Sequence, residues 1–312
     1  MYTLSERQTV TVFGGTGFLG RRVVDRLRGR DFTVRIAARR PNRSNPIVND
    51  PGGPVEVIGA DINDEKSITD AVADAFAVVN AVSLYVEQRP NTFWSVHVEA
   101  ALRLARCSRA MGVTRFVHVS GIGANATSSS SYIRSRGDGE RAVRAAFPQA
   151  VIVRPSVMFG PDDAFLTPLA NLVQKLPAFP LFGAGETALQ PSYVEDVAEA
   201  VVRILDAPSP EPIYELGGPR IYRYRELVQI LAKQLGTGSA LIPIPFWAWK
   251  IGALVAEGLP GAPLTRNQVE LMQIDNVASL ELPGFADLGI APTGIQAVLR
   301  AQGTSTTRSR NL

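Results

Sequence analysis

The chain has 312 residues, of which 46% are hydrophobic and 20% charged, so it has an ordinary globular composition and can bury a sizeable core. Its formal net charge of +3 suggests a mild affinity for anions, and no basic run of five residues marks it as a nucleic-acid-binding protein. The single cysteine, Cys107, excludes an intrachain disulfide and a cysteine cluster, and with only 2 histidines we expect no metal site.

The first predicted element is a strand over 10–13, followed by a glycine loop and a helix over 21–28. The loop fits two dinucleotide-binding patterns, G-x-x-G-x-x-G from Gly14 and G-x-G-x-x-G from Gly15. Such glycines permit a tight turn and close approach to a pyrophosphate, which the helix N-terminus attracts. A purely structural turn is the alternative. We predict that a dinucleotide contacts Gly14, Gly15, Thr16, Gly17, Phe18, Leu19 and Gly20.

Strand-like apolar runs alternate with helical patterns through the first half of the chain. After the first strand, we predict strands over 34–38, 55–58, 77–82, 116–120 and 151–154. Further helices are predicted over 66–74, 92–111 and 137–146. This alternation indicates βαβ units and therefore an α/β fold with a doubly wound parallel sheet of the Rossmann type.

Two arginines, Arg39 and Arg40, follow the second predicted strand. NAD-specific folds usually carry an acid there, which binds the adenosine ribose hydroxyls. Guanidinium groups attract a 2′-phosphate, so we predict that the cofactor is NADP(H) rather than NAD(H). A solvated basic loop is the alternative.

The next two strand ends complete the predicted nucleotide site. Asp61, followed by Ile62, comes after the third strand, where a carboxylate can accept a hydrogen bond from the adenine amino group. Asn80, Ala81 and Val82 end the fourth strand, where small residues let the backbone meet the ribose.

Prolines and glycines become dense after Pro155. We therefore expect a dinucleotide-binding core over 1–155 and a smaller mixed region over 156–302 that covers the cofactor crevice and shapes a substrate pocket. A strand near 213–216 is expected to complete the sheet, and 303–312 to form a flexible tail. Since the first strand begins about ten residues after Met1, no targeting peptide is expected, which predicts a cytoplasmic protein.

Residues 241–255 read LIPIPFWAWKIGALV, with Lys250 as the only charge. Pro243 and Pro245 prevent a helix before Phe246, and a short apolar helix is expected after it. The segment is too short to span a membrane. It either docks on a membrane surface or an apolar partner, or packs on the core of its own domain.

Several segments resemble the extended and atypical short-chain dehydrogenase/reductases, above all the nucleotide-binding accessory subunit of respiratory complex I and its bacterial relatives. The segments that carry this resemblance lie at 12–20, 115–120, 128–132, 139–143, 147–156, 159–160, 190–198 and 264–270.

The resemblance implies a catalytic site built from Ser, Tyr and Lys, the last two spaced as Y-x-x-x-K. Ser120 and Tyr132 fit this pattern, but Arg136 stands where the lysine is expected. Arginine keeps the charge but is not a conservative replacement at a packed site, so cofactor binding is compatible with Arg136 while hydride transfer is in doubt. The resemblance also assigns Ser120, Tyr132, Arg136, Pro155 and Ser156 to the nicotinamide end of the cofactor.

Two functions remain open on these grounds. The resemblance implies an NADP(H)-binding structural or sensing subunit of complex I or a quinone-related assembly, peripheral at the inner face of the membrane, with weak or no catalysis. The alternative is an active NADP-dependent reductase, epimerase or dehydratase that acts on a small or isoprenoid-like substrate.

Overall fold

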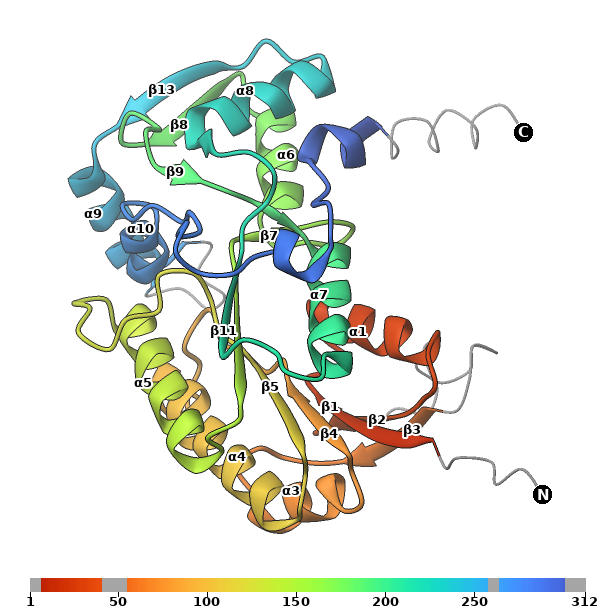
Figure 1. Cartoon of the computed structure of the whole chain (residues 1–312). Coiled ribbons are helices and arrows are strands. Elements are labelled where there is room, and N and C mark those ends of the chain that lie inside the picture. The colour runs from red at the N-terminus through yellow and green to blue at the C-terminus, as the bar shows by residue number, and fades with distance from the viewer. Residues whose placement is uncertain (1–6, 41–54, 258–263, 301–312) are drawn as a thin grey trace. The chain divides into compact units, whose positions relative to one another are not determined.

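The computed structural model describes residues 7–40, 55–257 and 264–300 (Figure 1). The chain divides into two compact units. The first unit holds the residues up to Arg154 together with Val194–Glu215 and Leu282–Ile290, and the second holds Pro155–Tyr193, Leu216–Glu281 and the residues from Ala291 onward. The tail expected over 303–312 lies outside the described residues.

A seven-stranded sheet forms the centre of the first unit. Its strands are β1 (Gln8–Phe13), β2 (Phe32–Ala38), β3 (Val55–Gly59), β4 (Ala77–Asn80), β5 (Arg115–Val119), β6 (Val151–Pro155) and β11 (Ile213–Leu216). They lie in the order β11-β6-β5-β4-β1-β2-β3, and the ladders from β6 to β3 are parallel. The order reverses between β1 and β4, which is the topological switch point where open α/β sheets bind their ligands.

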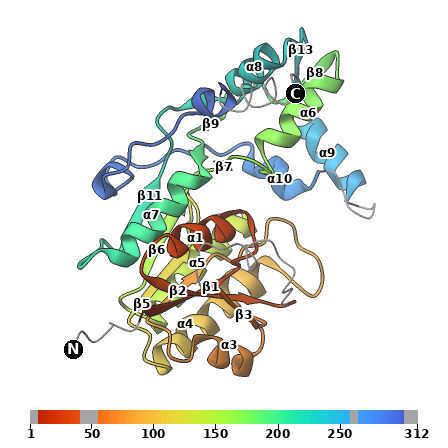
Figure 2. The ribbon, with the colours of Figure 1, turned by 90° about the vertical axis from the view of Figure 1, so that its right-hand side faces the viewer.

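Helices cover both faces of this sheet (Figure 2). On one face lie α1 (Phe18–Arg28) and α7 (Val194–Asp206), and on the other lie α3 (Glu65–Val72), α4 (Ala101–Ala110) and α5 (Ser131–Ala146). The π-helix η1 (Ser95–Ala100) leads into α4, and the short 3-10 helix η2 is Ala286–Leu288. The predicted α/β fold with a doubly wound, Rossmann-type sheet is thereby confirmed.

Burial on both faces explains the apolar character of the strands. Val10 and Val12 of β1 are fully buried, and so is Thr11 between them, whose hydroxyl donates to the carbonyl of Ala71 at 3.0 Å. Ion pairs tie α1 to α7, with Arg22 on Glu195 at 3.0 Å and Arg26 on Glu199 at 3.0 Å. The acidic first turn of α7 therefore pairs with α1.

The structure corrects one helix boundary. We expected the helix over 137–146 to begin at its first glycine, but α5 begins at Ser131. Gly137 and Gly139 lie inside the helix. Glycine is needed at both positions because neighbouring backbone lies against them and leaves no room for a side chain. A Cβ on Gly137 would lie 2.3 Å from the amide nitrogen of Ala126, and one on Gly139 would lie 2.0 Å from the carbonyl oxygen of His97.

The second unit has its own hydrophobic core, which includes Phe159, Val173, Leu181, Leu227 and Val228. Its helices are α6 (Leu166–Lys175), α8 (Tyr224–Leu235), α9 (Phe246–Ala256) and α10 (Arg266–Leu271). Its strands pair as β7 (Met158–Phe159) with β10 (Ser192–Tyr193), β8 (Ala178–Phe182) with β13 (Ala240–Ile244), and β9 (Ala188–Leu189) with β12 (Tyr222–Arg223).

We expect the Gly20→Ala variant to lower the free energy of unfolding by about 1–3 kcal/mol, because overpacking a tight site forces the backbone to move. The added methyl carbon would lie 2.0 Å from the carbonyl oxygen of Gly14. Gly29→Ala is the matched control: its φ is −73° and its nearest atom lies at 3.5 Å, so it should change stability by about 1 kcal/mol at most. Urea denaturation measures both, and equal losses would contradict the packing argument.

Candidate functional site

The glycine loop brings two backbone segments into close contact at the switch point. Gly14 has a φ of +77°, and a Cβ there would lie 2.9 Å from the carbonyl atoms of Ala81, which follows β4. The amide of Ala81 donates to the carbonyl of Phe13 at 2.9 Å. Gly20 lies with its Cα against Gly14, so α1 begins as close to the loop as backbone allows.

The N-terminus of α1 has the properties of an anion site. Gly17 is its N-cap, and no side chain of the described residues caps it. The first turn contains no acidic residue. Its free amides and the helix dipole therefore favour a phosphate at this position.

Arg39 and Arg40 are exposed directly after β2, the strand that pairs with β1. Asp61 is partly buried after β3, and its Oδ1 accepts hydrogen bonds from the amide and the side chain of Asn63 at 2.9 and 3.1 Å. The carbonyl of Ile62 accepts from Arg103 at 2.9 Å. These residues thus lie at the carboxyl edge of the sheet, beside the glycine loop.

Asn80 is buried at the end of β4, and its side chain is already bound within the sheet. Its Oδ1 accepts from the amide of Val82 at 3.2 Å, and its Nδ2 donates to Nδ1 of His118 at 3.1 Å. Only the backbone beyond it, at Ala81 and Val82, faces Gly14.

Ser120, Tyr132 and Arg136 gather beyond the ends of β4 and β5. Arg136 is buried, and its Nη2 donates to Oγ of Ser83 at 2.6 Å. Its guanidinium carbon lies 4.9 Å from the centre of the Tyr132 ring. Ser120 is also buried, and neither its Oγ nor Nε of Arg136 has a hydrogen-bond partner among the described residues. Buried polar atoms are usually hydrogen-bonded, so these two are available to a water molecule or a ligand.

Tyr132 is held among other rings. Phe93 and His97 contact it edge-on, with ring centres 5.3 and 5.6 Å away, and Tyr85 stacks at 6.1 Å. Burial raises the pKa of Tyr132 to about 12, although the charge of Arg136 opposes the rise. The phenol therefore keeps its proton near neutral pH.

Both histidines are buried and neutral. Burial, helped by the charge of Arg136, lowers the pKa of His97 to about 2 and that of His118 to about 3. Nε2 of His97 accepts from the amide of Leu84 at 3.2 Å, so its proton lies on Nδ1, which is 3.0 Å from Oγ of Ser135. That hydroxyl donates to the carbonyl of Tyr132 at 2.8 Å. The hydrogen bond with Asn80 holds His118 within the sheet.

A buried ion cluster holds α5 against the sheet. Arg154 on β6 donates to both carboxylate oxygens of Glu140 on α5, at 2.9 and 2.6 Å, and to Glu215 on β11 at 3.1 Å. Pro155 and Ser156 follow in the second unit, where Oγ of Ser156 donates to Oδ1 of Asn276 at 2.7 Å.

Sequence reasoning missed several residues around Tyr132 and Arg136. Ser83, Tyr85, Phe93, His97 and Ser135 all contact one of them or its neighbours. No local pattern identifies them. The only signal was the position of Ser83 just beyond a predicted strand.

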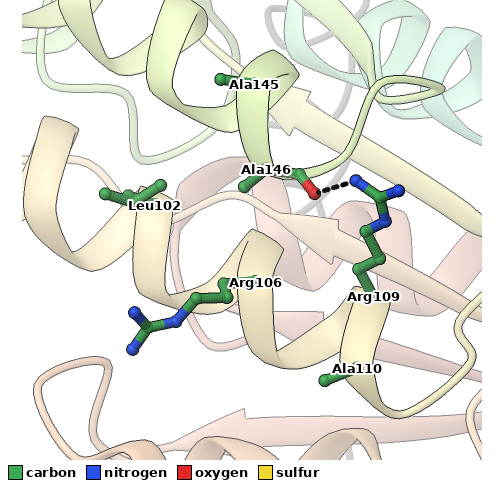
Figure 3. Close-up of a pocket in the computed structure, with 6 residues that line it drawn as sticks. All are labelled: Leu102, Arg106, Arg109, Ala110, Ala145 and Ala146. Carbon is green, nitrogen blue, oxygen red and sulfur yellow. Dashed lines mark hydrogen bonds between the residues drawn. The ribbon is translucent and has the colours of Figure 1, made fainter.

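A separate depression lies between α4 and α5 (Figure 3). It has a volume of about 660 Å³ and is lined by Leu102, Arg106, Arg109, Ala110, Ala145 and Ala146. Arg109 donates to the carbonyl of Ala146 at 3.2 Å, and Arg106 pairs with Glu65. Both helices end here, just before β5 and β6 begin, so the depression is at the opposite edge of the sheet from the glycine loop.

Segment 241–255 forms β13 and α9 in the second unit. Trp249 is anchored, since its Nε1 donates to the carbonyl of Leu181 at 2.9 Å and its ring packs on Phe182 at 4.4 Å. Trp247, Ile251, Leu254 and Val255 are exposed, at the spacing of one helix face. No helix within the described ranges has the length and hydrophobicity needed to cross a membrane.

The strand order, the switch point and the glycine loop define the class of Rossmann-type α/β proteins. Residues 10–217 match the NAD dependent epimerase/dehydratase family, and the chain belongs to that family.

Individual proteins within and beyond this family are also similar to the chain. The chain is 35% identical to NADH dehydrogenase (ubiquinone) 1 alpha subcomplex subunit 9, mitochondrial, of Mus musculus, over 92% of this chain and 77% of the relative. It is 31% identical to a ceramide reductase of Caulobacter vibrioides, over 77% of this chain and 74% of the relative. The structure of triphenylmethane reductase from Citrobacter sp. has the same fold, with a TM-score of 0.74 at 18% identity over 94% of this chain and 98% of that chain. The predicted family resemblance is confirmed.

Neutral buried histidines should make the protein sensitive to acid. Their folded pKa values lie below the unfolded value, so the unfolded chain binds protons first and stability is lost as pH falls below about 6.5. We expect each histidine to cost about 2 kcal/mol of unfolding free energy between about pH 7.5 and about pH 5. Urea denaturation measures the unfolding free energy that is lost between the two pH values. In His118→Gln this loss should be smaller than in the wild type by about 2 kcal/mol. An unchanged difference would contradict the prediction.

Proposed function

We propose that this protein is a nucleotide-binding accessory subunit of a respiratory complex I, in which the nucleotide serves a structural or sensing role. The observation that carries the proposal is the 35% identity to the Mus musculus subunit over 92% of this chain. Similarity over such a length includes both the glycine loop and the second unit.

The proposed nucleotide is NADP(H). Its pyrophosphate would lie at the amides that begin α1, and its 2′-phosphate at Arg39 and Arg40, which are exposed after β2. The unpartnered Oγ of Ser120 and Nε of Arg136 fit the polar groups of its nicotinamide half. A bound nicotinamide would supply hydride chemistry.

Two features support weak catalysis or none. A proton donor works best when its pKa is near the working pH, yet burial raises the pKa of Tyr132 to about 12. Arg136 is hydrogen-bonded to Tyr132 as well as to Ser83, yet its charge and this hydrogen bond do not offset the effect of burial on the pKa of Tyr132.

The alternative function is an active NADP-dependent reductase. The similarity to the ceramide reductase and the presence of Ser120 and Tyr132 favour it. Turnover of NADPH with a carbonyl substrate that disappears in Tyr132→Phe would overturn the accessory role in favour of the enzyme.

We expect Arg39→Ala to weaken NADPH binding by about tenfold, because one charge-assisted bond to the 2′-phosphate is lost. Binding of NADH, which has no such phosphate, should change by less than about twofold. Calorimetric titration of the full chain measures both affinities. Arg144→Ala, an exposed arginine on α5, is the control. Equal losses for NADPH and NADH would refute the assignment of the 2′-phosphate.

Segment 241–255 is the proposed docking site for a protein of the membrane-bound complex. The exposed face of α9 consists of Trp247, Ile251, Leu254 and Val255, while Trp249 fixes the helix to its own unit. Exposed apolar patches of this kind mark sites of interaction with proteins or membranes.

The double variant Trp247→Glu, Ile251→Glu should separate the protein from the membrane complex, because two charges would enter an apolar contact. We expect the fraction recovered with the complex after native purification to fall by about tenfold. The matched control is Trp94→Glu, since Trp94 is also exposed, at 51%, but lies in the first unit. The nucleotide extracted from the variant should be unchanged. Retention of the double variant in the complex would overturn this docking site.

A further inference from the structure

A side-chain cluster around the buried cation of Arg136 lies beyond the carboxyl edge of the sheet, on the β4 and β5 side of the switch point. Ser83 follows β4, Ser120 follows β5, and Arg136 reaches in from α5 to bind Ser83 at 2.6 Å. A dinucleotide spans such a switch point, with one half on each side. Given the proposed 2′-phosphate contact beyond β2, the nicotinamide half falls on the side of this cluster.

Arg136 gives this cluster a buried positive charge. Burial acts to lower the pKa of Arg136, but Tyr132 and Tyr85 raise it, so the guanidinium stays charged. The neighbouring imidazoles of His97 and His118 are neutral.

Among the residues that the structure describes, no carboxylate forms an ion pair with Arg136. Glu140 is the acid whose charge acts on Arg136, and both of its oxygens are bound by Arg154, at 2.9 and 2.6 Å. The Nε of Arg136 has no partner among the described residues.

We propose that this cluster retains the reduced nicotinamide dinucleotide in preference to the oxidised one, and that Arg136 sets the preference. This inference rests on the proposed function. The nicotinamide ring carries a formal positive charge when oxidised and none when reduced, so a buried guanidinium opposes only the oxidised form. The adenosine half is the same in both forms, and its contacts cancel in the comparison. The bound fraction would therefore follow the reduced-to-oxidised ratio of the cellular pool.

Calorimetric titration of the full chain, freed of bound nucleotide, with NADPH and with NADP⁺ tests the proposal. We expect NADPH to bind about tenfold more tightly, a difference typical of coupled charges. The preference should persist in about 0.5 M salt, since buried charges are screened less than exposed ones. It should fall below about twofold in Arg136→Met and remain in Arg136→Lys, which keeps the charge.

Adenosine 2′,5′-bisphosphate is the control ligand, because it lacks the nicotinamide half. It should bind the wild type and Arg136→Met equally, which also shows that the variant is folded. Equal affinities of the wild type for NADPH and NADP⁺ would overturn the inference without any variant, and so would a preference that survives in Arg136→Met. If neither dinucleotide nor the bisphosphate binds, the proposed function itself fails.

Discussion

The proposed nucleotide site at the carboxyl edge of the sheet depends on close backbone contact at the switch point. Gly14, Gly20 and Ala81 lie so close that a single methyl group at either glycine would collide with main-chain atoms. This contact places the amides of α1 where β1 ends and beside the segment that follows β4. Only residues without a Cβ satisfy it, which is why the glycine spacing is visible in the sequence.

A second constraint positions α5, the helix that carries Tyr132 and Arg136. Gly137 and Gly139 let the backbone of Ala126 and His97 approach it, and Arg154 binds Glu140 on its inner face. Removing one partner of a buried ion pair typically costs about 3–5 kcal/mol, so this anchor resists loosening. Arg136 is therefore buried by the packing of the whole helix.

The fold could be predicted because its signals are local. Apolar strands, the glycine loop and the helical patterns each occupy a short stretch, and the order of elements implies the sheet. The surroundings of Arg136 could not be predicted, because its partner Ser83 is 53 residues away in sequence. The predicted start of the helix at Gly137 was wrong because that glycine makes room for the backbone of Ala126, a packing contact that no local pattern reveals, and does not mark a helix end.

Retaining a bound nucleotide and catalysing a reaction with it require different properties of the same side chains. Burial acts against the charge of Arg136, which the neighbouring Tyr132 and Tyr85 preserve, and burial also raises the pKa of Tyr132 to about 12. A reductase needs that phenol to exchange a proton near neutral pH, and would need a cation aimed at the hydroxyl. Here Arg136 is hydrogen-bonded to both Tyr132 and Ser83, yet burial still holds the pKa of Tyr132 above its usual value. A fixed buried cation beside a phenol that keeps its proton is better suited to binding a ligand than to transferring a proton. An accessory subunit that binds a nucleotide requires only the binding.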